Sequence, residues 1–130
     1  MHLVGLPMSA VIVTGSRHWG DEEPIYRALD DACPTLVVQG GAAGADAIAR
    51  QWAKETRTPI RTFHANWLKH GRRAGPLRNG LMLRAYPQAI VLAFPLDGPG
   101  TADCMRQARE LGMRVIVYRD PSAHPRTEVE

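Results

Sequence analysis

The sequence has few cysteines and no long apolar run, and both shortages limit what the protein can be. Its two cysteines, Cys33 and Cys104, lie far apart in the chain and match no metal-binding spacing, so we expect reduced thiols in a cytoplasmic protein. No run approaches the ~18 apolar residues that a membrane span needs. Residues 1–7 lack the basic and apolar regions of a signal peptide. We therefore expect no membrane partner and no secretion.

Several motifs of catalysis and cofactor binding are also missing. No G-x-G-x-x-G follows the first apolar run, and Gln39 stands at the end of the second, where NAD binding requires an acidic residue. The sequence contains neither the P-loop motif nor the G-x-S-x-G nucleophile elbow. Its five histidines form no metal-spaced set with one another or with the cysteines. We therefore expect no cofactor and no metal.

Acidic residues are absent between residues 56 and 96, although the net charge of the whole chain is only +3. Seven basic residues lie in this segment: Arg57, Arg61, Lys69, Arg72, Arg73, Arg78 and Arg84. A segment of one sign indicates attraction for an anion, such as a phosphorylated ligand or a nucleic acid. The alternative is an ordinary solvated basic face.

The apolar runs predict an α/β protein. With 130 residues, the chain has the length of one domain with a real core. Five runs predict buried strands, at residues 10–14, 35–39, 60–63, 89–94 and 115–118. Helical patterns separate them, so we predict a single Rossmann-like three-layer domain whose five-stranded parallel sheet has the order 3-2-1-4-5. We assign residues 1–9 to a lead-in, 10–118 to the domain and 119–130 to a flexible C-terminal tail.

The helices between these strands have recognisable ends. Asp21 is expected to cap the first helix, and Thr101 the last. A second helix follows Gly44, and another is expected at about residues 78–86. Residues 64–77 show no clear period and predict a long connection, which is functional or mobile in many compact domains.

Three glycine-containing turns follow the first, second and fourth predicted strands. They contain Gly15, Ser16 and Arg17, then Gly40, Gly41 and Gly44, then Gly98, Gly100 and Thr101. Because the strand order reverses between strands one and four, these turns should open on one edge of the sheet, where ligands of such folds bind. Backbone N–H groups and helix N-termini at that edge would suit a phosphate or a carboxylate. The alternative is that the glycines only permit tight turns.

Four polar residues are candidates for ligand contacts at this edge. Arg17 can clamp a phosphate with its planar guanidinium, or it forms a surface salt bridge. Arg78 and Asn79 open a predicted helix and either add phosphate or base contacts or cap that helix. Asp46 either caps its helix or accepts hydrogen bonds from a ribose or a base.

Two tryptophans are expected in loops near the same edge. Trp19 and Trp67 can stack on a base there, or each can fill a gap in the core. Trp52 falls on the apolar stripe of its helix, so we assign it to the core.

Five motifs in order resemble the YspA-like branch of the SLOG superfamily. They are residues 11–19 (VIVTGSRHW), 38–46 (VQGGAAGAD), Trp67, 74–79 (AGPLRN), and 93–95 with 98–101 (AFP and GPGT). The superfamily joins the DNA-processing protein DprA to LOG-type cytokinin-activating enzymes. The resemblance covers roughly residues 10–118 and implies a Rossmann-like protein of a bacterium or phage that binds nucleotides or nucleotide-derived ligands. Relatives often pair, which implies a homo-oligomer, a dimer or higher.

The sequence departs from the LOG-type enzymes at the third glycine turn. Those enzymes carry P-G-G-x-G-T-x-x-E, whose glutamate serves cleavage of a nucleotide's glycosidic bond. Here the turn is one residue longer, and Cys104, which we assign to the core, takes the place of the glutamate. Hydrolysis would then require Asp97 or Asp103 as the catalytic residue. Pro99 also removes one N–H group from the turn.

Three functions remain open at this stage. The first is binding of a nucleotide or nucleotide-derived ligand at the carboxyl ends of the strands, for sensing or processing. The second is LOG-like N-glycosidic cleavage of a nucleoside monophosphate. The third, ranked lowest, is DprA-like binding of single-stranded nucleic acid through the basic segment.

Overall fold

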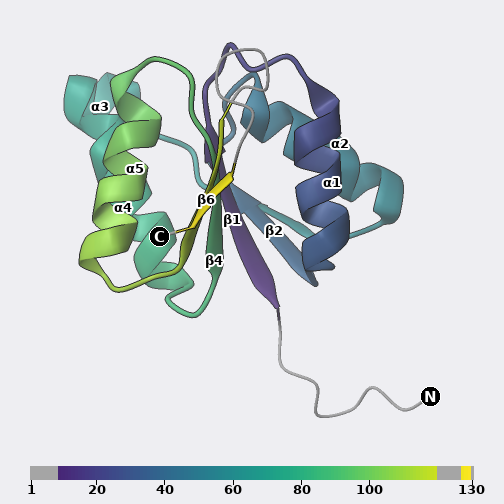
Figure 1. The fold of residues 1–130 in the computed structure, drawn as a ribbon. Coiled ribbons are helices and arrows are strands. Elements are labelled where there is room, and N and C mark those ends of the chain that lie inside the picture. The colour runs from purple at the N-terminus through teal and green to yellow at the C-terminus, as the bar shows by residue number, and fades with distance from the viewer. Residues whose placement is uncertain (1–8, 120–126, 130) are drawn as a thin grey trace.

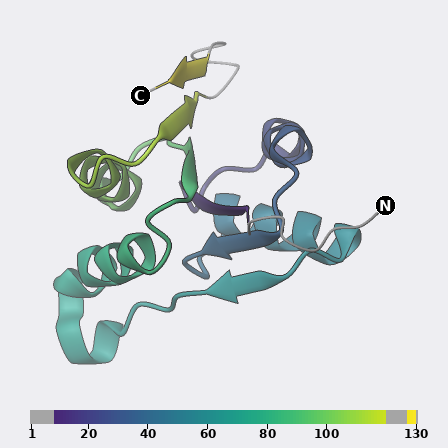
Figure 2. The same ribbon diagram turned by 90° about the horizontal axis from the view of Figure 1, so that it is seen from below.

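A computed structural model describes residues 9–119 and 127–129, and these form a six-stranded sheet between two layers of helices (Figure 1). The strands are β1 (Ala10–Gly15), β2 (Leu36–Gln39), β3 (Ile60–Thr62), β4 (Ile90–Phe94), β5 (Val115–Tyr118) and β6 (Thr127–Val129). The helices are α1 (Glu22–Ala32), α2 (Ala45–Thr56), α3 (Trp67–His70), the 3-10 helix η1 (Gly71–Arg73), α4 (Ala74–Ala85) and α5 (Pro99–Glu110). Seen from below, α1 and α2 cover one face of the sheet, and α4 and α5 cover the other (Figure 2).

The sheet confirms the predicted strand order and adds one strand. Its order is β3-β2-β1-β4-β5-β6, and the first five strands are parallel. β6 pairs antiparallel with β5 and was missed, because three residues within a polar tail give no strand signal. The remaining residues of the expected lead-in and tail, 1–8, 120–126 and 130, lie outside the described residues. In the register of β1 and β4, Gly15 lies opposite Phe94, so these strands end side by side at the topological switch point.

Alternation along the strands divides the core into two clusters. Val11 and Val13 of β1 face α1 and α2, where they join the buried rings of Trp19 and Trp52. Ile12, between them in sequence, points to the opposite face and packs in the cluster of α4 and α5. Strand side chains alternate in this way, and both faces of this sheet are buried. The continuous apolar runs of the sequence follow from that burial.

The starts of two predicted helices differ from the structure, and two short helices were not predicted. The connection expected at residues 64–77 contains α3 and η1, and α4 begins at Ala74 rather than at Arg78. The sequence of α4 shows no clear helical period because apolar residues lie on both its buried and its exposed sides, and Leu77 and Leu81 are on the exposed side. α5 begins at Pro99 with Gly98 at its N-cap, so Thr101 is not the cap. The predicted cap of α1 is confirmed, since the Asp21 carboxylate accepts a hydrogen bond from the Glu23 N–H.

The first turn of α2 lies directly against the end of β1. The Ala45 N–H donates to the Ser16 carbonyl at 3.1 Å. Gly44, the N-cap, has φ +68° and ψ −126°, a conformation that L side chains rarely adopt. A methyl group at Gly44 would also overlap the backbone of Ser16 and Arg17. Only glycine at this position lets the turns after β1 and β2 meet.

Replacing Gly44 with alanine should therefore destabilise the protein by about 3 kcal/mol or more, because strain in φ and a backbone clash act together. Urea denaturation followed by circular dichroism measures this loss. The matched control is Gly20→Ala, since a methyl group at Gly20 meets no atom within 4 Å. That variant should stay within about 0.5 kcal/mol of the parent. Equal free energies of unfolding for Gly44→Ala and Gly20→Ala would contradict the close approach of Gly44 to the backbone of Ser16 and Arg17.

Candidate functional site

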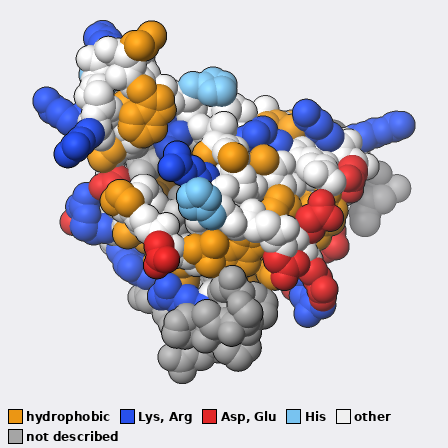
Figure 3. Space-filling view, turned by 90° about the horizontal axis from the view of Figure 1, so that it is seen from above, with side chains coloured by type: hydrophobic (Ala, Val, Ile, Leu, Met, Phe, Trp, Pro, Cys, Tyr) orange, Lys and Arg blue, Asp and Glu red, His pale blue; other side chains and the backbone are white. Residues whose placement is uncertain are grey.

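The buried polar side chains gather at the edge of the sheet where β1, β2 and β4 end, which we call the C-terminal edge. Within the described residues, they are Thr14, Ser16, Gln39, Asp46, Asn79 and Thr101. They come from the ends of β1 and β2 and from α2, α4 and α5. Figure 3 looks down on this edge and shows Lys, Arg and His side chains over its middle, with acidic side chains mainly toward the lower part of the view. Polar groups that are costly to bury thus meet at one place.

Arg78 and Asn79 join the second glycine turn to the third. The Nη1 of Arg78 donates to the carbonyl of Gly40 at 2.7 Å and to that of Phe63 at 3.1 Å. Its Nε donates to the Oδ1 of Asn79 at 2.9 Å. The Nδ2 of Asn79 in turn reaches the carbonyl of Gly100 at 3.3 Å. Since the first turn touches the second through Gly44, all three turns are neighbours at the C-terminal edge.

Side chains of the protein accept three N–H groups of the second glycine turn, those of Gly40, Gly41 and Ala42, which were expected to face a ligand. The Oδ2 of Asp46 accepts the N–H groups of Gly40 at 3.1 Å and Ala42 at 3.3 Å. The N–H of Gly41 donates to the Oε1 of Gln39 at 2.7 Å. The protein's own side chains therefore take up part of the set of N–H donors that was expected for an anion. Asp46 does not cap α2 but closes the turn before it, and the sequence pattern alone does not separate these two roles.

The second carboxylate oxygen of Asp46 has no partner. Oδ1 is buried and forms no hydrogen bond with any described residue. Burial raises the pKa of Asp46, while the N–H groups of Ala42 and Gly40 and the charges of Arg78 and Arg50 act against that rise. Asp46 is therefore an acid whose charged form is disfavoured by its surroundings.

Arg50 also supports this turn, and the sequence analysis did not identify it. Its Nη1 donates to the Oε1 of Gln39 at 2.8 Å and to the carbonyl of Ala42 at 3.1 Å. The available signal was its spacing, because Arg50 lies four residues after Asp46 on the same helix and so on the same face. Two arginines, Arg50 and Arg78, thus hold carbonyl oxygens of the second turn.

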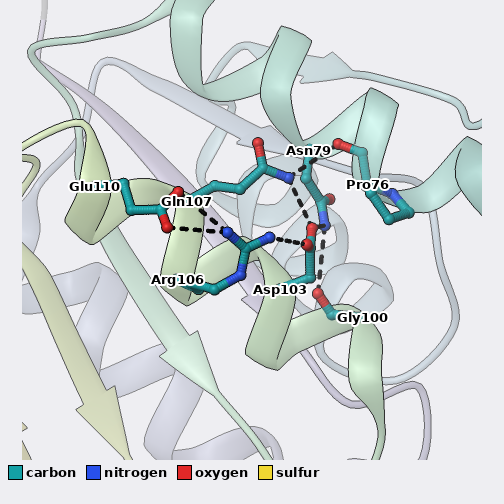
Figure 4. Close-up of polar contacts among 7 residues, drawn as sticks. All are labelled: Pro76, Asn79, Gly100, Asp103, Arg106, Gln107 and Glu110. Carbon is teal, nitrogen blue, oxygen red and sulfur yellow. Dashed lines mark hydrogen bonds and ion pairs between the residues drawn. The ribbon is translucent and has the colours of Figure 1, made fainter.

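A second polar network joins α4 to the first turns of α5 (Figure 4). The Oδ2 of Asp103 accepts hydrogen bonds from Asn79 at 3.0 Å and from Gln107 at 2.8 Å. Its Oδ1 pairs with Arg106 at 2.7 Å. Partial burial acts to raise the pKa of Asp103, but the hydrogen bonds from Asn79, Gln107 and Arg106 outweigh it and lower that pKa. Asn79 therefore positions α5 and does not cap α4.

Asp97 and Asp103, the two candidates for a catalytic role in hydrolysis, have different surroundings. Asp103 is held as an anion by its three donors, which is unsuitable for a general acid. Asp97 is exposed on the turn before α5. Cys104 is fully buried, as expected of a core residue, and burial raises the pKa of its thiol to about 11. A thiol with that pKa is not a nucleophile at neutral pH.

Groups at the first and third turns are open to a ligand. Arg17 is exposed, and among the described residues its side chain hydrogen-bonds only to His18, from Nε to Nε2 at 3.4 Å. No side chain caps α2 or α5, whose N-cap residues are glycines. The first N–H groups of a helix have no partner within that helix, so α5 presents those of Gly100 and Thr101. The C-terminal edge therefore combines an unpaired cation with helix N–H donors.

The tryptophans fall into two environments. Trp19 is only 3% exposed, packs edge to face on Phe94 at 5.6 Å and donates its Nε1–H to the Asp21 carbonyl. Of the two roles left open for Trp19, the structure therefore supports the core role and not base stacking. Trp52 is also buried, as predicted, and donates to Asp30. Trp67 is 59% exposed on α3, with its ring over Gly75.

In residues 9–119 and 127–129, no three His, Cys, Asp or Glu side chains gather in a way that could hold a metal ion. Across these ranges, no helix combines the length and the apolar character needed to cross a bilayer.

The opposite pKa shifts of Asp46 and Asp103 predict opposite pH dependences of stability. Folded Asp46 binds its proton more tightly than the unfolded chain does, so its contribution to stability falls as pH rises from about 4 through its raised pKa. The free energy of unfolding of the parent, relative to Asp46→Asn, should therefore decrease over this range. Urea denaturation at a series of pH values measures the difference.

Asp103→Asn serves as the control of opposite sign. Folded Asp103 releases its proton more readily than the unfolded chain does, so its contribution is lost as pH falls below about 4. Relative to Asp103→Asn, the parent should therefore lose stability toward acid. If the free energies of unfolding of the parent and of one variant changed equally with pH, the described environment of that aspartate would be contradicted.

Two comparisons with known proteins show which proteins this chain resembles in sequence. Residues 9–70 match the model of the YspA, cpYpsA-related SLOG family. The chain is also 42% identical over 125 residues to the "Gene 61 protein" of Mycobacterium phage D29. That similarity covers 87% of this chain and 98% of the phage protein. The matched family segment contains the first two glycine turns and the whole of α2.

Proposed function

Because this chain belongs to the YspA, cpYpsA-related SLOG family, we propose that it binds a nucleotide or nucleotide-derived ligand at the C-terminal edge. The ligand's phosphate lies between Arg17 and the N-terminus of α5, where Gly100 and Thr101 supply N–H donors. The single observation that carries this proposal is the exposed guanidinium of Arg17, which has no ion pair among the described residues. An exposed cation and a helix N-terminus without a side-chain cap, both on turns at the same edge of the sheet, favour an anion.

The second turn shapes this site without holding the phosphate. Asp46 accepts the N–H groups of Gly40 and Ala42, and Arg50 and Arg78 hold the carbonyls of the same two residues. This support fixes the wall of the site in advance of binding, which lowers the ordering cost that a ligand must overcome.

Loss of the Arg17 side chain should weaken binding of a nucleoside monophosphate about tenfold or more, because a charge-assisted contact to phosphate is lost. Isothermal titration calorimetry with the common ribonucleoside monophosphates and their parent nucleosides measures this effect. The control is Arg27→Ala, which removes an exposed arginine of α1 that pairs with Glu23. The proposal fails if Arg17→Ala and Arg27→Ala bind alike, or if no monophosphate binds more tightly than its nucleoside.

Hydrolysis of the glycosidic bond has no comparable support. The position of the LOG-type glutamate is taken by the buried Cys104, and Asp103 is held as an anion by three donors. We therefore expect binding without release of base. Chromatography after incubation with each monophosphate should show no free base. Base release by the parent that Asp97→Asn abolishes would establish the hydrolase instead.

A further inference from the structure

Exposed large hydrophobic side chains gather on α3 and α4. The described residues include six such side chains, and four of them lie here: Trp67 (59% exposed), Leu68 (103%), Leu77 (41%) and Leu81 (59%). Leu77 and Leu81 are four residues apart on α4, so they share one face of the helix. We call these four residues the α3–α4 surface. Such a gathering of apolar side chains on a protein surface marks an interaction site.

The charged residues that α3, η1 and α4 themselves carry are all basic. Lys69, Arg72, Arg73 and Arg84 are exposed, and none of them forms an ion pair within the described part of the chain. No Asp or Glu occurs from residue 56 to residue 96 to neutralise them. The upper left corner of Figure 3, formed by α3 and η1, accordingly shows basic and hydrophobic side chains together. The expected partner is therefore negatively charged.

The surface is held in place although α3 has only four residues. The Oδ1 of Asn66 caps α3 by accepting the Lys69 N–H at 3.1 Å. The Trp67 ring lies 3.3 Å from the point at which a Cβ of Gly75 would stand. α3 continues through η1 into α4 without a break, and the three pack against one another. A rigid apolar surface loses little conformational freedom when a partner binds.

We propose that the α3–α4 surface docks a partner protein that presents apolar side chains surrounded by carboxylates. The partner's apolar side chains cover Leu68, Leu77 and Leu81, and its carboxylates face Lys69, Arg72 and Arg73. Burial of the leucines supplies the binding free energy, and the charges select the partner and accelerate its association.

Two other occupants fit the same observations less well. A second copy of this chain, docked symmetrically, would bring identical basic residues together, and like charges facing each other oppose association. A single-stranded nucleic acid could stack one base on Trp67 and pair with the basic residues. It would leave the three aliphatic leucines uncovered. The apolar character of the surface therefore favours a protein.

Selection from a random peptide display library tests this proposal. The folded parent is the bait, and the double variant Leu77→Gln/Leu81→Gln is used for counter-selection. Both leucines are exposed, so the variant should keep the parent's thermal unfolding midpoint. We expect selected peptides to combine acidic and large apolar residues and to bind the double variant at least tenfold more weakly. Leu111→Gln, which changes an exposed leucine at the end of α5, should bind them like the parent.

Three outcomes would overturn the proposal. The first is enrichment of basic or uncharged peptides. The second is displacement of selected peptides by a single-stranded oligonucleotide that itself binds the parent more tightly. The third is sedimentation of the parent as a dimer that the double variant abolishes, which would assign the surface to a second copy. Nucleotide binding at the C-terminal edge should be the same in the parent and the double variant, so this proposal and the proposed function are tested separately.

Discussion

The Asp46 carboxylate closes the glycine turn after β2, and the arrangement of the C-terminal edge depends on this contact. By accepting the N–H groups of Gly40 and Ala42, it fixes a turn that three glycines would otherwise leave flexible. The fixed turn presents its carbonyls to Arg50 and Arg78, which join it to α2 and α4. A buried acid with one unpartnered oxygen is costly. The hydrogen bonds that this acid accepts from Gly40 and Ala42 offset part of that cost and fix the turn at the C-terminal edge.

The distribution of charge along this edge follows from the same contact. The Asp46 carboxylate accepts two N–H groups of the second turn, and two nearby arginines, Arg50 and Arg78, donate to backbone carbonyls there. Arg17 and the first N–H groups of α5 are left without such partners in the described chain. The second turn of the candidate site thus keeps fewer free N–H donors than an equivalent open glycine turn would supply, and the exposed cation, Arg17, lies on the first turn.

The fold could be predicted from the sequence because buried strands leave long apolar runs and because crossovers in parallel sheets have one hand. The location of the candidate site followed from the strand order. The roles within it did not, since a glycine turn looks the same whether its N–H groups meet a phosphate or Asp46. Trp19 was similarly ambiguous, because only packing against Phe94 distinguishes a core ring from an exposed one. Arg50 was missed although its spacing from Asp46 was a signal, because its partners, the Ala42 carbonyl and Gln39, can be identified only in the folded turn.

The short strand β6 has a consequence for the way this sheet ends. A parallel sheet of five strands would expose the hydrogen-bonding groups of β5 along its full length, and such an edge can recruit strands from other molecules. β6 covers that edge with an antiparallel neighbour from the same chain, leaving the three-residue β3 at the opposite side. A chain truncated after Tyr118 would lose this protection and become prone to aggregation through β5, although every residue of the candidate site would still be present.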